Sequence, residues 1–535
     1  MKRSIFVLLA LALIVGAVPA RAQFLDQNRT DRAAPNTAKD LGAQGPQPAP
    51  TTPITVKPFA LVSVEISGAS VPPELVGAAS KSFIGQTIDA AGIKKITDAL
   101  ATAYAKSDIA LYTIVAPEQD FAGGVLKIRV VEGYIENVDL QGDTKGDLDL
   151  VKAYAKKLMA ERPLKRATLQ RYLSLIRDIA GLTVDSQLVT GSAPGATRLV
   201  LKLSQKDLLL TLGVNNNGNP LLGRTQLSGS AAFYGLLQEG EQTTVSLGAP
   251  TDLSLYQFVS VADAEPIGSE GTMAQMTAGY LHTKPKLIGE SGEAESLQML
   301  VAHPLIRSYD ESLVVSADLD GLNSNDAFLG QLFSDERTRA VRLSANYSLT
   351  SPKDFINLAL TLSNGLDFLG ARIIPNGTAV PDFHKVNFSG GYNRLLDPDW
   401  VVRLKTAAQL AGNRLPVSEL FSLGGPDYGR SFAVATAIGD EALAESAEIA
   451  WHPTTFPIDF LKGSELYGFA DRGETWYLSR PPFNSGTVTL SSAGVGTRLA
   501  VWKDTSLQLE VAKPLDAPPG FKHGWTFEVG FKSVN

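Results

Sequence analysis

From about Leu208 to the C-terminus, the chain consists of segments of roughly ten residues in which apolar and polar side chains alternate. Gly, Asn, Asp, Pro and Ser separate these segments. Successive side chains of a β-strand point to opposite faces, so each segment predicts a strand with one apolar and one polar face. Such strands form either a transmembrane barrel, with lipid outside and water inside, or a soluble all-β protein that must cover every apolar face.

The charged residues of these segments favour the barrel. Several of them lie on the polar face of their strands. A barrel requires this, because a charge at mid-bilayer on the lipid face costs about 2–4 kcal/mol. They are Arg342, Arg403, Lys405, Arg498 and Glu510. We count 16 segments, an even number as in bacterial single-chain barrels. They begin near Leu208, Thr225, Glu241, Leu253, Met273, Glu295, Ser312, Arg337, Asp354, Phe383, Trp400, Ala442, Ser464, Gly486, Thr505 and Gly524.

The N-terminus has the pattern of a secretory signal peptide over residues 1–22. Lys2 and Arg3 precede an apolar run from Ile5 to Val18, and Ala20-Arg21-Ala22 is a small-x-small cleavage site. The apolar run is shorter than the ~20 residues that span a bilayer. Residues 23–57 are polar and then rich in proline, which predicts a short segment and an extended linker. Composition alone leaves disorder equally open for this stretch.

Two consecutive units of similar length follow, at residues 58–134 and 135–206. In the first, strand-like Val62 to Ile66 precedes a helical pattern from Ile88 to Lys106, and two further strands follow. The second unit has the same order, with helices near 148–159 and 167–180. The order β-α-α-β-β therefore occurs twice, which predicts two α+β domains in front of the barrel, itself residues 207–535.

Composition excludes several function classes. The chain has no cysteine, so disulfides and thiolate metal sites are excluded. The net charge of −7 gives no reason to expect a nucleic-acid partner. The five histidines are scattered, and no phosphate loop or nucleophile elbow occurs, so we expect no enzyme, metal or cofactor. They are His282, His303, His384, His452 and His523.

Three stretches resemble the POTRA-containing transporters of two-partner secretion, the TpsB or haemolysin secretion/activation family. The first, 116–136, resembles the end of a first POTRA domain and contains Gln119, Asp120, Gly124, Glu132 and Gly133. The second, 163–182, resembles the second POTRA domain. The third, Phe421 to Phe432, resembles the family's long loop motif and contains Gly424, Gly425, Gly429, Arg430 and Phe432.

The resemblance implies a lock between this loop, about 421–441, and the barrel wall. In the family the loop arginine, here Arg430, reaches into the barrel and pairs with an acidic wall residue. The matching wall motif supplies Asp471, with Phe469 and Gly473 on the same parity. The guanidinium fork suits a carboxylate, and we expect Gly473 to leave space beside it. This chain departs from the family by Gly at 429 and Ser at 431.

The resemblance also implies the remaining assignments. Residues 23–57 correspond to a plug helix and linker, and Phe527 and Phe531 to the C-terminal strand signal, with four residues overhanging beyond Phe531. The expected protein is a monomeric outer-membrane pore whose periplasmic POTRA domains capture a secreted partner polypeptide, a large β-helical exoprotein, and pass it outward unfolded. Outer-membrane lipids are the other expected partner. The alternatives are a barrel-assembly or insertase protein and a general diffusion porin.

Overall fold

The computed structural model describes residues 56–535, except 122, 145, 147, 287–288, 329–330, 454–461, 482–483, 503 and 522–523. The predicted signal peptide and nearly all of the predicted plug and linker lie outside the described residues. The described chain forms two compact units, with a boundary between Lys206 and Asp207. The short segment Arg307–Tyr309 groups with the N-terminal unit. In the part of the chain that the structure describes, no helix is long and apolar enough to cross a membrane.

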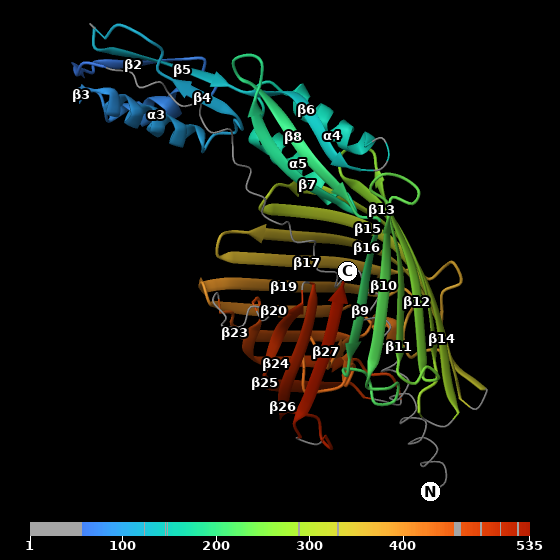
Figure 1. Cartoon of the computed structure of the whole chain (residues 1–535). Coiled ribbons are helices and arrows are strands. Elements are labelled where there is room, and N and C mark those ends of the chain that lie inside the picture. The colour runs from blue at the N-terminus through green and yellow to red at the C-terminus, as the bar shows by residue number, and fades with distance from the viewer. Residues whose placement is uncertain are drawn as a thin grey trace. The chain divides into compact units, whose positions relative to one another are not determined.

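The N-terminal unit contains the repeated α+β arrangement (Figure 1). In the first repeat, β2 and β4 flank β5, and helices α2 and α3 cover this sheet, while β1 and β3 form a separate pair. Leu126 and Ile128 of β5 are buried against Ile96 and Leu100 of α3. The bounds are β1 Phe59–Ala60, β2 Ser63–Ser67, α2 Pro73–Lys81, β3 Thr87–Ile88, α3 Ala90–Tyr104, β4 Tyr112–Val115 and β5 Val125–Glu132.

The second repeat has the same topology, with β6 and β7 flanking β8. Its core joins Leu199 and Leu201 of β8 to Leu158 and Leu173 on the two helices. The bounds are β6 Tyr134–Asp143, α4 Asp149–Ala160, α5 Arg166–Asp178, β7 Leu182–Thr190 and β8 Ala196–Gln205. The predicted order of elements is thus present in both repeats.

The C-terminal unit is a closed antiparallel barrel of sixteen strands (Figure 1). The short β18 (Arg372–Ile374) pairs additionally with β16. The sixteen are β9 Leu208–Asn215, β10 Gln226–Tyr234, β11 Gln242–Pro250, β12 Tyr256–Ile267, β13 Thr272–Thr283, β14 Glu290–Arg307, β15 Glu311–Phe328, β16 Gln331–Thr350, β17 Asp354–Gly365, β19 His384–Asp397, β20 Trp400–Ala411, β23 Glu441–Trp451, β24 Glu465–Tyr477, β25 Gly486–Trp502, β26 Thr505–Asp516 and β27 Thr526–Val534.

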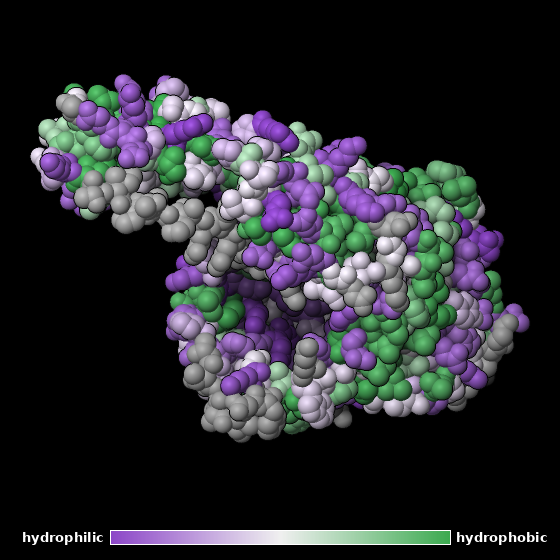
Figure 2. All heavy atoms as spheres, turned by 45° about the horizontal axis from the view of Figure 1, so that its top comes forward, coloured by the Kyte–Doolittle hydropathy of each residue, from purple (hydrophilic) through white to green (hydrophobic). Residues whose placement is uncertain are grey.

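The two faces of the wall separate as the alternation predicts. On β16, Val341 and Leu343 are exposed on the outside, whereas Arg342 between them is buried inside. Figure 2 shows hydrophilic side chains lining the hollow of the barrel and hydrophobic ones covering its outer wall. The predicted barrel with an apolar outer face is therefore confirmed.

The barrel closes between its first and last strands. Strand β27 pairs with β9 from Gly530↔Asn215 to Val534↔Thr211. Asn535 also donates its backbone N–H to the carbonyl of Leu210. The expectation of four overhanging residues beyond Phe531 is wrong, because these residues complete the seam.

Candidate functional site

The segment between β20 and β23, residues 412–440, folds into the lumen. It contains a 3-10 turn, Val417–Glu419, and a hairpin of β21 (Phe421–Leu423) and β22 (Ala437–Gly439). Phe421, Leu423 and Phe432 are buried against inward-facing wall residues of β20, β23 and β25. The wall is suited to this packing because the inward row of β23 carries small side chains such as Ala442 and Ala444. We call residues 412–440 the inner loop.

Arg430, at the tip of the inner loop, is buried among carboxylates of the wall. Its Nη1 donates to Glu448 Oε2 and to Glu510 Oε2, each at 3.2 Å. Its guanidinium also lies 4.1 Å from the centroid of the Phe469 ring, a cation–π contact. Its Nη2 donates to Ser446 Oγ at 3.4 Å, so the hydrogen-bond partners of the arginine side chain are two acidic residues and a serine that lie outside the wall motif.

Asp471 lies beside Arg430 but holds the backbone of the loop more closely than the guanidinium. Its Oδ2 is 3.9 Å from Arg430 Nε, which is an ion pair without a hydrogen bond. Its Oδ1 accepts hydrogen bonds from Gly429 N at 2.8 Å and Ser492 Oγ at 2.6 Å. The structure thus brings the two predicted residues together, but in place of a fork pairing, Asp471 joins the backbone of the loop tip at Gly429 to Ser492 on wall strand β25.

Gly473 makes room for the loop itself. A Cβ at this position would lie 2.6 Å from Leu423 Cδ2, so only the absence of a side chain lets Leu423 reach the wall. The expectation that Gly473 leaves space beside the carboxylate is therefore wrong. Two further glycines, Gly494 and Gly496, give space to the rings of Phe469 and Tyr467 on the neighbouring strand. An isolated Gly-x-Gly on a strand has many explanations, so the sequence alone does not identify these two positions.

The glycines of the loop motif set its backbone. Gly424, Gly425 and Gly429 have φ values of 102°, 93° and 76°, a region in which glycine is favoured. Gly425 N donates to Phe432 O, which closes the tip. Ser431, where the family has glycine, is not among the positive-φ residues, so the serine costs no backbone strain. The departures from the family pattern are thus accommodated at 429 and 431.

Two further ionic anchors hold the inner loop toward its ends, and no sequence motif indicates either of them. Glu419 pairs with Arg342 Nη2 and with Lys385 Nζ, both at 2.8 Å. Asp440 pairs with Arg480 Nη2 at 2.7 Å. Arg342 was expected to face the lumen, but parity alone does not name the loop residue it binds.

Two more arginines bind Glu448, the carboxylate that also accepts a hydrogen bond from Arg430. Glu448 accepts from Arg403 Nη1 at 2.8 Å and from Arg498 Nη2 at 2.9 Å, and both arginines also bond Glu465. Together with Lys405 and Ser446, these groups and Arg430 line a cavity of about 340 Å³ in the lumen. Glu448 therefore keeps two cationic partners when Arg430 is withdrawn.

The POTRA motif residues stabilise the first repeat and its junction with the second. The Gln119 side chain donates to Lys127 O and accepts from Lys127 N, so it extends the pairing of β5 beyond β4. Gly124 O accepts the backbone N–H of Val62, and Gly133 N donates to Leu111 O. Asp120 is exposed.

Glu132 connects three parts of the first repeat. It accepts from Ser70 N at 2.7 Å, Ser70 Oγ at 2.6 Å and the Tyr104 hydroxyl at 2.9 Å. Burial, and then the hydrogen bond to Glu132, raise the pKa of the Tyr104 hydroxyl above its ordinary value. Tyr104 therefore remains a protonated donor at neutral pH.

A Glu132→Ala variant should lose about 1–3 kcal/mol of stability in the first repeat, because the fully buried Tyr104 hydroxyl is left without its acceptor. Amide hydrogen exchange over residues 58–134 of the full-length protein measures this loss. Glu118→Ala, at an exposed position of the same repeat, is the control and should leave exchange unchanged. Equal exchange in both variants would contradict the assignment.

The last strand places its aromatic residues on the outer face. Phe527 and Phe531 are exposed on β27, as are Val529 and, just before the strand, Trp525. Their role as a strand signal stays a prediction. Among the described residues, no group of three or more His, Asp or Glu side chains is placed to hold a metal ion.

Comparison with known families identifies two matching models. The model of the haemolysin secretion/activation protein ShlB/FhaC/HecB matches residues 195–499. The model of the ShlB-type POTRA domain matches residues 59–133. The first covers more than half of the chain and includes the inner loop and most of the wall.

Individual proteins are similar over most of the chain. The heme/hemopexin transporter protein HuxB of Haemophilus influenzae is 21% identical over 453 residues, covering 82% of this chain and 80% of that protein. The outer membrane transporter CdiB of Escherichia coli is 23% identical over 505 residues, covering 89% and 82%. The solved structure of Escherichia coli CdiB matches the fold with a TM-score of 0.71 at 20% identity, over 97% of this chain and 98% of that one. BamA from Haemophilus ducreyi, lacking POTRA domains 1–3, matches with a TM-score of 0.53 at 13% identity, over 90% and 100%.

Proposed function

The chain belongs to the haemolysin secretion/activation protein family ShlB/FhaC/HecB, and we propose that its inner loop closes the export pore between transport events. The protein is a two-partner secretion transporter of the outer membrane, with POTRA domains in the periplasm. The pore lets a secreted partner polypeptide pass outward. Passage of a polypeptide requires the inner loop to leave its place in the lumen.

One observation carries this proposal: charged contacts hold the inner loop near both ends and at its tip, to the wall through Arg342, Lys385 and Glu448, and to Arg480 in the β24–β25 connection. Glu419 and Asp440 hold the ends, and Arg430 holds the tip. These ionic contacts suit a reversible closure, because water can solvate the separated charges when the loop leaves the wall.

The partner enters as an extended chain at the periplasmic side. Each repeat of the N-terminal unit has a three-stranded sheet. Within the described residues, its outer strands pair on one side only, namely β2 and β4 in the first and β6 and β7 in the second. An extended segment can add a strand at such an edge through backbone hydrogen bonds, with little demand on sequence. This recognition suits a polypeptide captured before it folds.

The finer features of the partner and assembly are part of the proposal. We propose a large β-helical exoprotein as cargo, because such a fold adds one coil after another outside the cell and can proceed as the chain emerges. The barrel acts as a monomer, since one closed wall holds the whole lock. The chain acts as a conduit rather than as an enzyme.

The proposed function is tested by deleting the gene and following the cognate partner in the periplasm and the culture medium. We expect the partner to disappear from the medium, and a plasmid copy of the transporter to restore it. The abundance of unrelated outer-membrane barrels, measured in the same cells, should stay unchanged. General loss of those barrels would support the insertase alternative instead, and continued secretion would reject the transporter.

A further inference from the structure

On four neighbouring strands, β14 to β17, the outward side chains change from apolar to polar at a common level of the wall. The N-terminal unit precedes β9 and is periplasmic, so β9 and every second strand after it, including β15, run outward. The apolar side chains lie on the periplasmic side of the boundary and the polar ones on the extracellular side. The apolar set is Leu297, Met299, Leu319, Val341, Leu343, Leu358, Leu360 and Leu362, and the polar set is Glu293, Glu295, Asn323, Asn325, Arg337, Arg339 and Asn364. This boundary marks the level of the headgroups in the outer leaflet.

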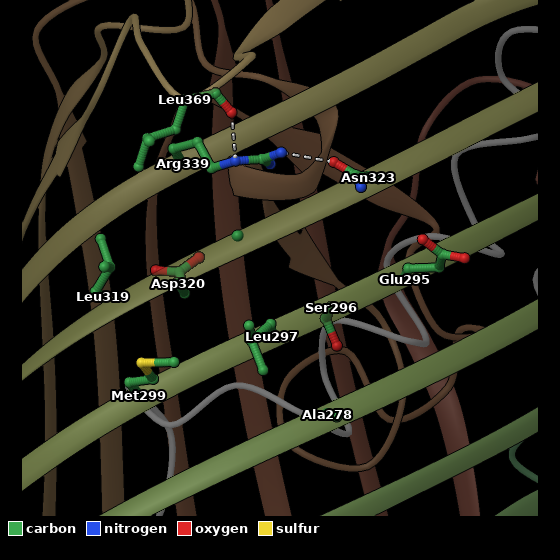
Figure 3. A pocket seen from close by; sticks show the side chains of 11 residues that line it. Ala278, Glu295, Ser296, Leu297, Met299, Leu319, Asp320, Asn323, Arg339 and Leu369 are labelled. Carbon is green, nitrogen blue, oxygen red and sulfur yellow. Dashed lines mark hydrogen bonds between the residues drawn. The ribbon is translucent and has the colours of Figure 1, made fainter.

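A pocket of about 440 Å³ opens in the outer wall at this boundary. Figure 3 shows Arg339 of β16 at one edge of the pocket, reaching toward Asn323, and Glu295 of β14 on the opposite side. Leu297, Met299 and Leu319 line the part that faces the apolar band. Asp320 of β15, which pairs with Arg342, lines the pocket as well, so the pocket combines one arginine, two carboxylates and an apolar floor.

Arg339 is held in place by neutral oxygens only. Its Nε donates to Leu369 O at 3.2 Å, and its Nη2 donates to Asn323 Oδ1 at 2.9 Å. Its Nη1 donates to the carbonyls of Leu322 and Thr338. No ion pair joins Arg339 to a carboxylate in the described part of the wall, whereas its neighbour Arg337 pairs with Asp335 at 3.4 Å. The Arg339 guanidinium is thus positioned without an ion pair, and the Asp320 carboxylate, which attracts it at longer range, is itself paired with Arg342.

The wall provides a dedicated space for this arginine. Gly321 of β15 lies directly opposite Arg339 in the register. A Cβ at position 321 would lie 3.3 Å from Arg339 Cδ and 3.5 Å from its Nε, so the guanidinium stem crosses the strand over the glycine. A side chain larger than a methyl group would push it away from Asn323 and Leu369.

We propose that this pocket binds the phosphorylated glucosamine headgroup of lipid A in the outer leaflet. Arg339 binds a phosphate, for which an arginine without a carboxylate partner is the matching charge. Glu295 accepts hydrogen bonds from sugar hydroxyl and amide groups. One acyl chain lies along Leu297, Met299 and Leu319, where contacts with these side chains replace its contacts with neighbouring lipid chains. A phospholipid would offer a phosphate as well, but no sugar donors for Glu295.

The test uses the full-length protein in detergent, titrated with purified lipid A and followed by native mass spectrometry of the intact complex. We expect one tightly bound lipid A per chain. Arg339→Ala should weaken binding about tenfold, the size of one charge-assisted contact of about 1.4 kcal/mol. Gly321→Val should weaken it similarly with the arginine still present. Arg337→Ala removes the same charge from the same face of β16, two residues away from Arg339. This variant should bind lipid A as the unchanged protein does.

Two further probes identify the source of the phosphate. Dephosphorylated lipid A should bind about as weakly to the unchanged protein as lipid A does to Arg339→Ala. Phosphatidylethanolamine should bind more weakly than lipid A. Equal binding of phosphatidylethanolamine, or equal loss with Arg337→Ala and Arg339→Ala, would overturn the proposal, as would binding of lipid A that neither variant changes.

Discussion

Replacing Arg430 by Ala should abolish secretion of the partner while raising the frequency of open events in planar bilayers. The substitution removes the loop's charge from beside Glu510 and Asp471, whereas Glu448 keeps Arg403 and Arg498 as partners. Removing one member of a buried ionic cluster costs about 3–5 kcal/mol, so the equilibrium constant for docking of the loop tip should fall by about two to four orders of magnitude.

Secretion fails in this variant because the freed tip does not leave the lumen. Glu419 and Asp440 still hold the two ends of the inner loop, so the tip occupies many positions in the path of the passing chain. Secretion of the partner and single-channel recordings of the purified variant check both parts of the prediction.

The matched control is Arg472→Ala. Arg472 neighbours Asp471 on β24 but is largely exposed on the opposite face, near Glu474. The control removes the same charge from the same strand and should leave secretion and conductance unchanged. Unchanged secretion in Arg430→Ala would reject the lock, because the loop arginine would then be dispensable for transport.

The barrel could be predicted from sequence because one physical constraint acts on every strand. Lipid requires an apolar side chain at every second position, so the period appears wherever the wall is embedded. The predicted start of the strand near Glu295 lies five residues inside β14, which begins at Glu290. The difference arises because β14, β15 and β16 extend beyond the apolar band. There neither face of the strand contacts the lipid core, so apolar and polar side chains no longer alternate.

The lock could be predicted only in part. Arg430 and Asp471 were found through the family motif, and the structure places them together. Glu448 was not predicted as a partner, although it lies on the same inward face of β23 as Ala444 and Ser446 and the alternation indicates this. Alternation assigns a side chain to the lumen, but it does not say which of sixteen strands the loop tip reaches, because that depends on the closure of the whole barrel.

The same limit applies to the glycines of the wall. Gly473, Gly494 and Gly496 each give space to a bulky side chain on another segment, Leu423, Phe469 and Tyr467 respectively. A strand glycine in a sequence indicates a close approach but not its partner. Only the register between β24 and β25, with Phe469 opposite Gly494, identifies which ring fills which gap.

Covalent attachment of the inner loop to the wall tests most directly whether the loop must leave the lumen. The chain has no cysteine, so a pair introduced as Leu423→Cys and Gly473→Cys has no competing thiol in the protein. A Cβ at position 473 would lie 3.2 Å from Leu423 Cγ, the site of the new sulfur, which is close to disulfide geometry.

The measurement is the amount of partner secreted by cells that carry the double variant, under oxidising conditions and after addition of dithiothreitol, with Leu423→Cys alone as control. Our account predicts that the cross-linked transporter secretes no partner, that reduction restores secretion, and that the control secretes in both conditions. Secretion at the control's level while the cross-link is intact would contradict the account, because the polypeptide would then pass with the inner loop still docked.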